Sequence, residues 1–307
     1  MRRGYYFLAA SLPDLFRGRT SGAGSLEEYL DYCETQVTPE DFDTLKQLFL
    51  FNDARNAVTY RSKEDSFVSP SFYSAEQMLK LIDEPESFFP FLRRYAATRI
   101  EEQRERPELT EIDELISYFY EALDDVADDF VREYYANELE LRNIGAAFEL
   151  RAGEFELAKY LIPLGRAYEL IMKNPEANDL GLSVDFPYAR NLYQLYDEAD
   201  LTKREEMLDQ IRWQWLDERV GADLFSLNFL AAYAIKLASV ERWSSLSVEK
   251  GEELFQDLLD TVRRSVRFEI EFAHLTEEQK AERRRQLEEE RRRAQNTEQT
   301  QSGEESR

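Results

Sequence analysis

The sequence predicts an all-α protein, and three observations favour that class. The 307-residue chain contains only 11 glycines and 9 prolines, so it has few of the turn residues that connect many short strands. It carries no Val- and Ile-rich alternating run of the kind that forms a half-buried strand. Helix-start patterns recur along it instead, and its 43% hydrophobic and 13% aromatic content is that of an ordinary folded protein.

Four segments place a hydroxyl-bearing residue three positions before an acid or an amide, which is the pattern of a helix capping box. They are Ser25–Glu28, Thr38–Asp41, Ser74–Gln77 and Thr202–Glu205. Apolar residues at helical spacing follow each of them, as in Phe42, Leu45, Leu48 and Phe49 after Thr38. We therefore expect amphipathic helices to begin at these points.

The longest apolar stripe begins near Thr110 and continues to Tyr135, so it predicts about 25 residues of helix, as one helix or as two. Asn174–Asp185 then has the composition of a surface loop. We expect four parts, whose bounds follow. They are N-terminal helical repeats at 1–172, a linker at 173–187, a C-terminal helical repeat at 188–274, and a charged helical and then disordered tail at 275–307.

The charge of the chain excludes some partners. Its net charge is −24, and because nine acids and eight bases lie from Leu275 onward, the preceding body carries 54 acids against 31 bases. Such a field repels phosphate backbones, so we expect no nucleic-acid binding. The longest apolar stretch, Leu227–Ile235, is far below the ~20 residues of a spanning helix, so any membrane association is expected to pass through a partner.

Histidine and cysteine are almost absent. The sequence has one of each, His274 and Cys33, which excludes zinc sites built from several such ligands and leaves little for nucleophilic catalysis. We expect Cys33 to be a small buried apolar side chain and His274 to be a surface residue. A lone cysteine forms no internal disulfide. The short apolar run Tyr5–Leu12 is similar to the start of a signal peptide, but it stops at Pro13 and no signal-peptide cleavage site follows. A cytoplasmic location is the simplest expectation.

An aspartate cluster gives the sharpest catalytic pattern. It consists of Asp124, Asp125, Asp128 and Asp129, a spacing that places four carboxylates on one side of a helix. Such an array can hold Mg²⁺ and a diphosphate, as in helical isoprenoid synthases. No second metal motif accompanies it, and a chain with 63 acids produces exposed clusters by chance. A magnesium-dependent synthase is therefore an alternative function, and a generic helical adaptor is another.

A sequence motif that is repeated within the chain is more informative than these single residues. The segment from Asp53 through Arg55, Asn56 and Arg61 is answered by one that runs from Arg142-Asn143 through Arg151 to Gly153. A looser third copy runs from Glu241, Arg242 and Trp243 to Gly251. Arg190-Asn191 shows that the dipeptide also occurs by itself. Repetition with similar flanks indicates a helical unit that is used more than once.

With these motifs, residues 5–262 resemble the C subunit of V/A-type rotary ATPases, which is the d subunit in eukaryotes. The similarity is greatest to a bacterial branch of proteins like this C subunit, whose genes accompany those of V-type ATPases. That family opens with a Tyr-rich helix like Tyr5–Leu12 and repeats an acid, Asn and Arg at the helix that closes each repeat. The third copy has Trp243 where Asn is expected, and the first copy lacks the closing glycine.

The resemblance implies an elongated, funnel-like helical protein with internal pseudo-repeats, seated on the membrane rotor ring and receiving the end of the central stalk. It implies a non-catalytic coupling role with no cofactor or metal, ATPase subunits of the stalk and ring as partners, and a peripheral position on the cytoplasmic face of the inner membrane. A body with this acidic excess would suit basic surfaces on such partners.

Overall fold

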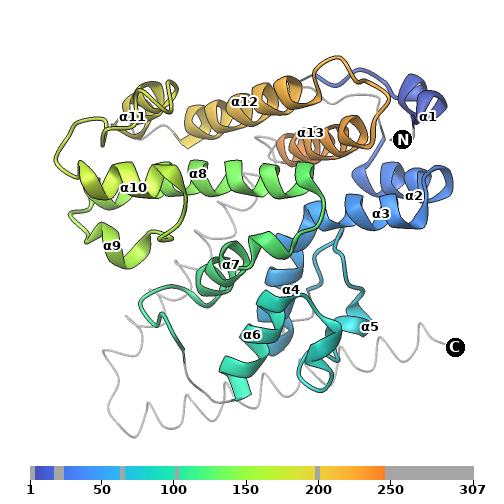
Figure 1. The fold of residues 1–307 in the computed structure, drawn as a ribbon, viewed down its shortest axis with the longest axis horizontal. Coiled ribbons are helices and arrows are strands. Elements are labelled where there is room, and N and C mark those ends of the chain that lie inside the picture. The colour runs from blue at the N-terminus through green and yellow to red at the C-terminus, as the bar shows by residue number, and fades with distance from the viewer. Residues whose placement is uncertain (1–3, 17–23, 63–65, 101–103, 198–200, 246–307) are drawn as a thin grey trace, which may run out of the picture. The chain divides into compact units, whose positions relative to one another are not determined.

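The computed structural model describes residues 4–16, 24–62, 66–100, 104–197 and 201–245. The predicted all-α class is confirmed, because every regular element in these ranges is a helix (Figure 1). The described residues up to Ser244 belong to one compact unit. None of the helices in the described ranges combines the length and the apolar character that crossing a membrane requires.

The first half of the chain forms short helices around a shared core. Their bounds are α1 Tyr6–Ser11, α2 Leu26–Gln36, α3 Pro39–Lys46, α4 Leu50–Ser62, α5 Ala75–Met78 and α6 Pro90–Ile100, with the 3₁₀ turns Gln47–Phe49 and Pro85–Ser87. The capping boxes predicted at Ser25 and Ser74 are both present. Thr38 caps α3 through the backbone N–H of Asp41, and Pro39 occupies the first turn, where its missing N–H costs nothing.

The long apolar stripe after Thr110 forms two helices. These are α7 Glu111–Glu121 and α8 Asp129–Ala152, separated by the 3₁₀ turn Leu123–Asp125. The remaining helices are α9 Leu157–Tyr160, α10 Gly165–Lys173, α11 Ala189–Asp197, α12 Leu201–Val220 and α13 Leu227–Ser245. Because α12 already contains Leu201, Thr202 lies inside its first turn, and the predicted cap at Thr202 is wrong.

Two hydrophobic cores lie along α8. The first contains the N-terminal half of α8 and the buried faces of α2, α3, α4, α6, α7 and α13. The second contains the C-terminal half of α8 together with α10, α11 and part of α12. Leu180 and Leu182, from the segment predicted to be a linker, are fully buried in this second core. The division of domains at residues 173–187 stays a prediction.

Helix α12 runs antiparallel to α8 and is held to it by charged pairs. Arg204 pairs with Glu149 and Arg212 with Glu138, each at 2.8 Å, and Arg219 pairs with Glu133. The residue numbers fall on α8 as they rise on α12, which is the order of an antiparallel pair. Each pair is weak alone where it is exposed, but three in register fix how the two helices slide against each other.

One smaller prediction is confirmed, and another falls outside the described residues. Cys33 is fully buried in the first core, as expected for a small apolar side chain. The aromatic block at 88–92 also packs there, through Phe88, Phe91 and Leu92. His274 and the whole charged tail lie outside the described residues.

Candidate functional site

The first copy of the Arg-Asn pattern forms a polar clamp on α4. Asn56 donates from Nδ2 to the carbonyl of Val68 at 3.0 Å and accepts the N–H of the same residue at 2.7 Å. The Asp53 carboxylate, three residues earlier, accepts the N–H groups of Phe72 and Tyr73, both at 2.9 Å. Both side chains are buried. Together they attach the segment that follows α4 to the helix.

The second copy forms the same clamp on α8. Asn143 accepts the N–H of Ile162 at 3.1 Å and donates to the carbonyls of Ile162 and Leu164 at 3.0 and 3.1 Å. Glu140, three residues earlier, accepts the N–H groups of Arg166 and Ala167, both at 2.7 Å. The segment that enters α10 is thereby attached to α8.

The two clamps share one register. In each, the asparagine binds both the N–H and the carbonyl of one residue of the returning segment, and the acid binds the N–H groups four and five residues further along. Gly165 stands between these contacts in the second copy with φ +84°, and a Cβ there would lie 2.9 Å from the Glu140 carboxylate. Only glycine lets the backbone pass so close. The repeat predicted from sequence is therefore a repeated hydrogen-bonding unit in these two copies.

Burial raises the pKa of both clamp acids, so they are weaker acids than usual. Desolvation raises the pKa of Asp53 to about 7, although hydrogen bonds from the N–H groups of Tyr73 and Phe72 and the charge of Lys46 act the other way. Desolvation also raises the pKa of Glu140 above its usual range. In both clamps, the stabilisation of the carboxylate by backbone N–H groups is smaller than the cost of burying it.

The third copy is built differently. Val240 and Trp243 occupy the positions of the acid and the asparagine, so α13 has no clamp of this kind. Trp243 Nε1 donates to the Asp209 carboxylate of α12 at 2.6 Å, and Arg242 Nη2 contacts both carboxylate oxygens at 2.7 and 2.8 Å. Ser239 Oγ donates to the same carboxylate at 2.7 Å. The third copy binds the preceding helix instead of a returning segment.

The pKa of Asp209 is shifted in the opposite direction to the pKa values of the clamp acids. Burial alone would raise its pKa, but hydrogen bonds from Ser239 and Trp243 and the charges of Arg242 and Arg212 together lower it. Asp209 is only 3% exposed, so it is a buried carboxylate that keeps its charge. It forms the polar centre of the contact between α12 and α13.

The arginines of the first two copies line the same cleft. Arg55 from α4 and Arg142 from α8 both line a 680 Å³ cleft, and residues of α7, α11 and α12 complete its wall. Arg142 pairs with Asp113 of α7, and the Arg212–Glu138 pair lines the same cleft. Arg55 is exposed and pairs with no described side chain. The cleft has a mixed apolar and charged wall, and Arg55 is a side chain there that is available to meet a ligand.

Other residues of the predicted motif have structural contacts. Arg151 donates to the carbonyls of Ala177 and Asn178, both at 2.7 Å, and so fixes the loop after α10. Gly153 is the residue at which α8 ends, but its φ is −90°, and Glu154 takes the left-handed conformation. Glu241 accepts the N–H of Leu26 at 2.8 Å. The side chain of Arg61 and all of Gly251 lie outside the described residues.

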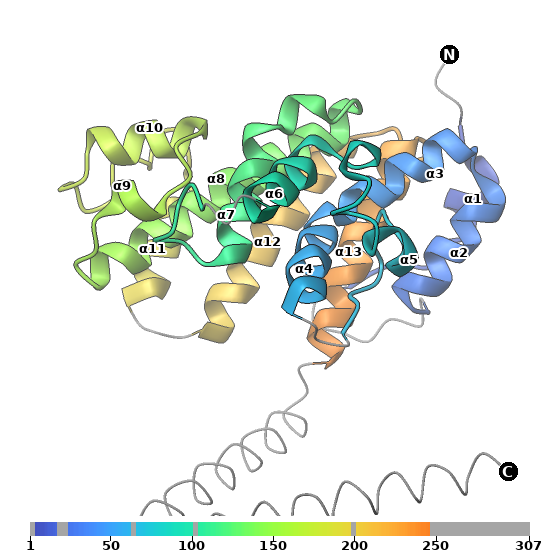
Figure 2. The ribbon, with the colours of Figure 1, turned by 90° about the horizontal axis from the view of Figure 1, so that it is seen from below.

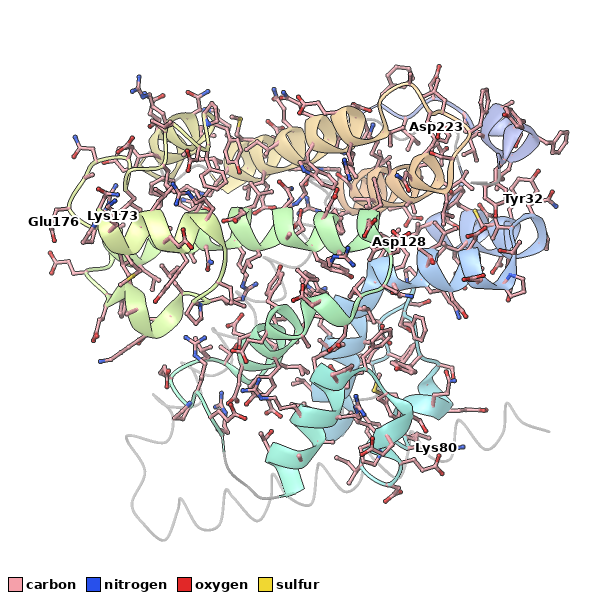
Figure 3. All side chains as sticks on the ribbon, in the orientation of Figure 1. Tyr32, Lys80, Asp128, Lys173, Glu176 and Asp223 are labelled. Carbon is pink, nitrogen blue, oxygen red and sulfur yellow. The ribbon has the colours of Figure 1, made fainter. Side chains whose placement is uncertain are left out.

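The aspartate cluster does not form the predicted one-sided array. Asp124 and Asp125 belong to a 3₁₀ turn, while Asp128 caps α8 through the N–H of Val131 at 3.0 Å (Figure 3). Asp129 pairs with Arg132 in the first turn of α8. The prediction of one helix face was wrong because a helix start prefers acids and uses them here. Within the described ranges, no group of Asp, Glu, His or Cys side chains is arranged to hold a metal ion.

Sequence reasoning missed the acid that completes the second clamp. The predicted second copy begins at Arg142, although Glu140 stands where Asp53 stands in the first copy, two residues before the arginine. Aligning the two Arg-Asn dipeptides would have revealed this acid. The returning segments could not be found this way, because their backbone groups leave no signal in side-chain identity.

Comparison with known proteins gives a family and no function. A family model described as a protein of unknown function, DUF2764, matches residues 1–266. No curated protein and no solved structure matched the chain.

Proposed function

We propose that this chain, which belongs to the DUF2764 family of unknown function, is a non-catalytic coupling subunit of a V/A-type rotary ATPase. In this role it links the rotor axle to the membrane rotor ring and transmits torque. The proposal starts from the resemblance of its Tyr-rich opening and repeated acid, Arg and Asn to the C subunit of those enzymes.

The repeated clamp is the observation that carries the proposal. The resemblance implies internal pseudo-repeats, each closed by a helix with an acid, an Asn and an Arg. Asp53 with Asn56, and Glu140 with Asn143, form one hydrogen-bonding pattern in one register on two helices. Chance similarity between two short motifs gives no reason for their partners to match as well. The match supports descent of the two units from one repeat.

Stiffness is the physical property that torque transmission needs. Fully satisfied, buried polar networks hold a fold in one arrangement. The two clamps fix returning segments to helices, and the Arg–Glu pairs along α8 and α12 fix the register of two long helices. These devices suit a part that forwards a load without deforming.

The cleft lined by Arg55 and Arg142 is our candidate seat for a partner segment. Its wall combines aromatic and aliphatic side chains with charged pairs, a mixture found in protein–protein interfaces. Arg55 adds an exposed positive group in an otherwise acidic body. A partner segment with an apolar face and a carboxylate, such as the end of an axle helix, would meet both features.

Co-purification from the native membrane tests this proposal. The full chain, tagged and solubilised in mild detergent, should bring down the stalk and ring subunits of the ATPase. Arg55→Glu should weaken recovery of the stalk subunits, because it reverses the charge in the cleft. Arg190→Glu, an exposed arginine on α11, is the matched control and should leave recovery unchanged.

Three outcomes of these experiments would contradict the coupling role. If neither set of subunits accompanies the chain, the rotary role is wrong. Mg²⁺-dependent diphosphate release that is lost in Asp125→Asn would favour the synthase instead, and recovery of an unrelated complex would favour an adaptor.

A further inference from the structure

An aromatic surface lies where α1 meets the loop between α12 and α13. Tyr6 is 65% exposed and Phe7 77% exposed, and Leu224 and Phe225 of the loop are 49% and 38% exposed. We call these four residues the aromatic patch. Single exposed apolar residues are ordinary, but a contiguous group of large ones is typical of an interaction surface.

The patch is a built surface rather than a frayed end. The rings of Tyr6 and Phe225 stack with centroids 4.7 Å apart. The N–H of Tyr5 donates to the carbonyl of Phe225 at 2.7 Å, and Tyr5 Oη donates to Asp41 of α3. Tyr233 of α13 donates to the carbonyl of Pro13 at 3.1 Å and so holds the chain that leaves α1. Contacts from the α12–α13 loop, α3 and α13 therefore hold α1 and both of its ends in place.

Acidic residues gather on two helices near the patch. From Gly24 to Lys46, which includes α2 and α3, the sequence has seven acidic residues and one basic residue, Lys46. Both helices lie beside α1 in two views (Figures 1 and 2). Asp223 adds a carboxylate next to Leu224, and Figure 3 shows it at the same end of the molecule as Tyr32 of α2. Acidic residues thus lie next to the apolar surface, on α2, on α3 and in the loop before α13.

This combination decides among the possible occupants. An anionic lipid surface and a second copy of this acidic patch would both place like charges together, which costs energy at a contact. A helix with apolar residues on one face and Lys or Arg beside them satisfies the rings and the carboxylates at once. We propose that the aromatic patch is a docking site for a basic amphipathic helix of a partner protein.

This inference does not depend on the proposed coupling role. It concerns a different surface from the cleft lined by Arg55, and a basic helix could come from an ATPase subunit or from any other protein. The two proposals can therefore fail separately.

Binding of a defined peptide to the full chain tests the docking site. The probe is a dye-labelled helix of about 18 residues, roughly five turns, with Leu on one face and Lys on the other, and its partner probe has Glu in place of Lys. Anisotropy should show binding of the Lys peptide that weakens with salt, and little binding of the Glu peptide. Phe7→Ser combined with Phe225→Ser should weaken binding about tenfold or more.

Matched variants separate the patch from general stickiness. Val184→Ser removes an apolar side chain that is 88% exposed on another loop and should leave binding unchanged. Glu27→Gln with Asp31→Asn, both exposed on α2, should weaken binding a few-fold, whereas Glu176→Gln at the other end of the molecule in Figure 3 should not. Phe7→Ser alone, at the most exposed ring, repeats the test without disturbing the stack of Tyr6 and Phe225.

Three results would overturn the proposal. The first is equal peptide affinity in the wild type and in both Phe7→Ser variants. The second is a Phe7-dependent binding to phosphatidylcholine vesicles without Phe7-dependent peptide binding, which would make the surface a membrane contact. The third is a self-association, seen by sedimentation, that Phe7→Ser abolishes, which would make it a contact between copies.

Discussion

Helices α4 and α8 carry the acid, arginine and asparagine of the repeated motif, whereas α13 carries only the looser third copy and makes different contacts. On α4 and α8 an acid and an asparagine, three residues apart, hold the backbone of a segment that comes later in the chain. On α13 the corresponding positions hold Val240 and Trp243, and the polar contacts point back to Asp209 on α12. The acid and the asparagine define the unit, while the arginine between them is free to vary in its partner.

The largest expected effect breaks the contact that is special to α13. Asp209→Ala should lower the free energy of unfolding by about 4 kcal/mol, because it removes a buried carboxylate that accepts hydrogen bonds from Trp243, Ser239 and Arg242. Urea unfolding followed by tryptophan fluorescence measures this. Asp217→Ala on the same helix removes a 69% exposed carboxylate and should cost less than about 1 kcal/mol. Similar losses in both variants would contradict the buried role of Asp209.

Breaking the second clamp should come next. Asn143→Ala should cost about 3 kcal/mol, since the N–H of Ile162 and the carbonyl of Leu164 lose this partner, and the carbonyl of Ile162 keeps only the N–H of Leu164. Asn191→Ala provides the control, because this asparagine follows an arginine in the same way but is exposed on α11. Its change should stay within about 0.5 kcal/mol in the same urea titration. A small effect at Asn143 would show that water replaces the clamp.

The first clamp should be weaker than the second. Asn56→Ala removes the reciprocal bonds with Val68 alone, so the expected cost is about 2 kcal/mol. Hydrogen exchange should show faster exchange of the Val68 amide in this variant, with the Ile162 amide little changed. Equal exchange at both amides would mean that the two clamps open together and are not separate units.

The pH dependence sharpens the comparison further. The folded pKa of Asp53, about 7, lies above the ordinary 3.8 of the unfolded chain, so its contribution to stability is full below 3.8 and is lost as pH rises through 7. Between pH 8 and pH 6 the wild type should gain about 1.4 kcal/mol relative to Asp53→Asn. Urea titrations of both proteins at the two pH values measure this gain.

Asp209 should behave in the opposite way. Its folded pKa is lowered, so its contribution to stability is present above pH 3.8 and disappears as the pH falls through the folded pKa.

One outcome would contradict the prediction for Asp53. If the wild type and Asp53→Asn had the same pH dependence of stability between pH 8 and pH 6, Asp53 would titrate at its ordinary pKa.

Much of the helical framework could be predicted because its signals are local. Ser25, Thr38 and Ser74 cap helices through residues three positions away, so the sequence alone contains both partners. The same local chemistry misled the interpretation of the aspartate cluster, since acids at a helix start and acids on a helix face look alike in one sequence. Asp128 serves as a cap rather than as a metal ligand.

The site could be predicted only in part, because its partners are distant in the chain. The Arg-Asn repeat was visible, but Asn143 bonds to residues 19 and 21 positions later, and only the fold brings them together. The contacts of the third copy had no sequence signal either. Asp209 is one of several acids on the strongly charged helix α12, and its burial depends on how α12 packs against α13.

Helix α8 supplies side chains to both hydrophobic cores, from Phe130 and Val131 in the first to Ala147 and Phe148 in the second. An unbroken backbone therefore crosses from one core to the other, with no hinge between them in the described residues. Melting either core deprives that helix of half its packing. We accordingly expect heat to unfold both cores in a single cooperative transition, because loss of one core removes packing that α8 needs to support the other.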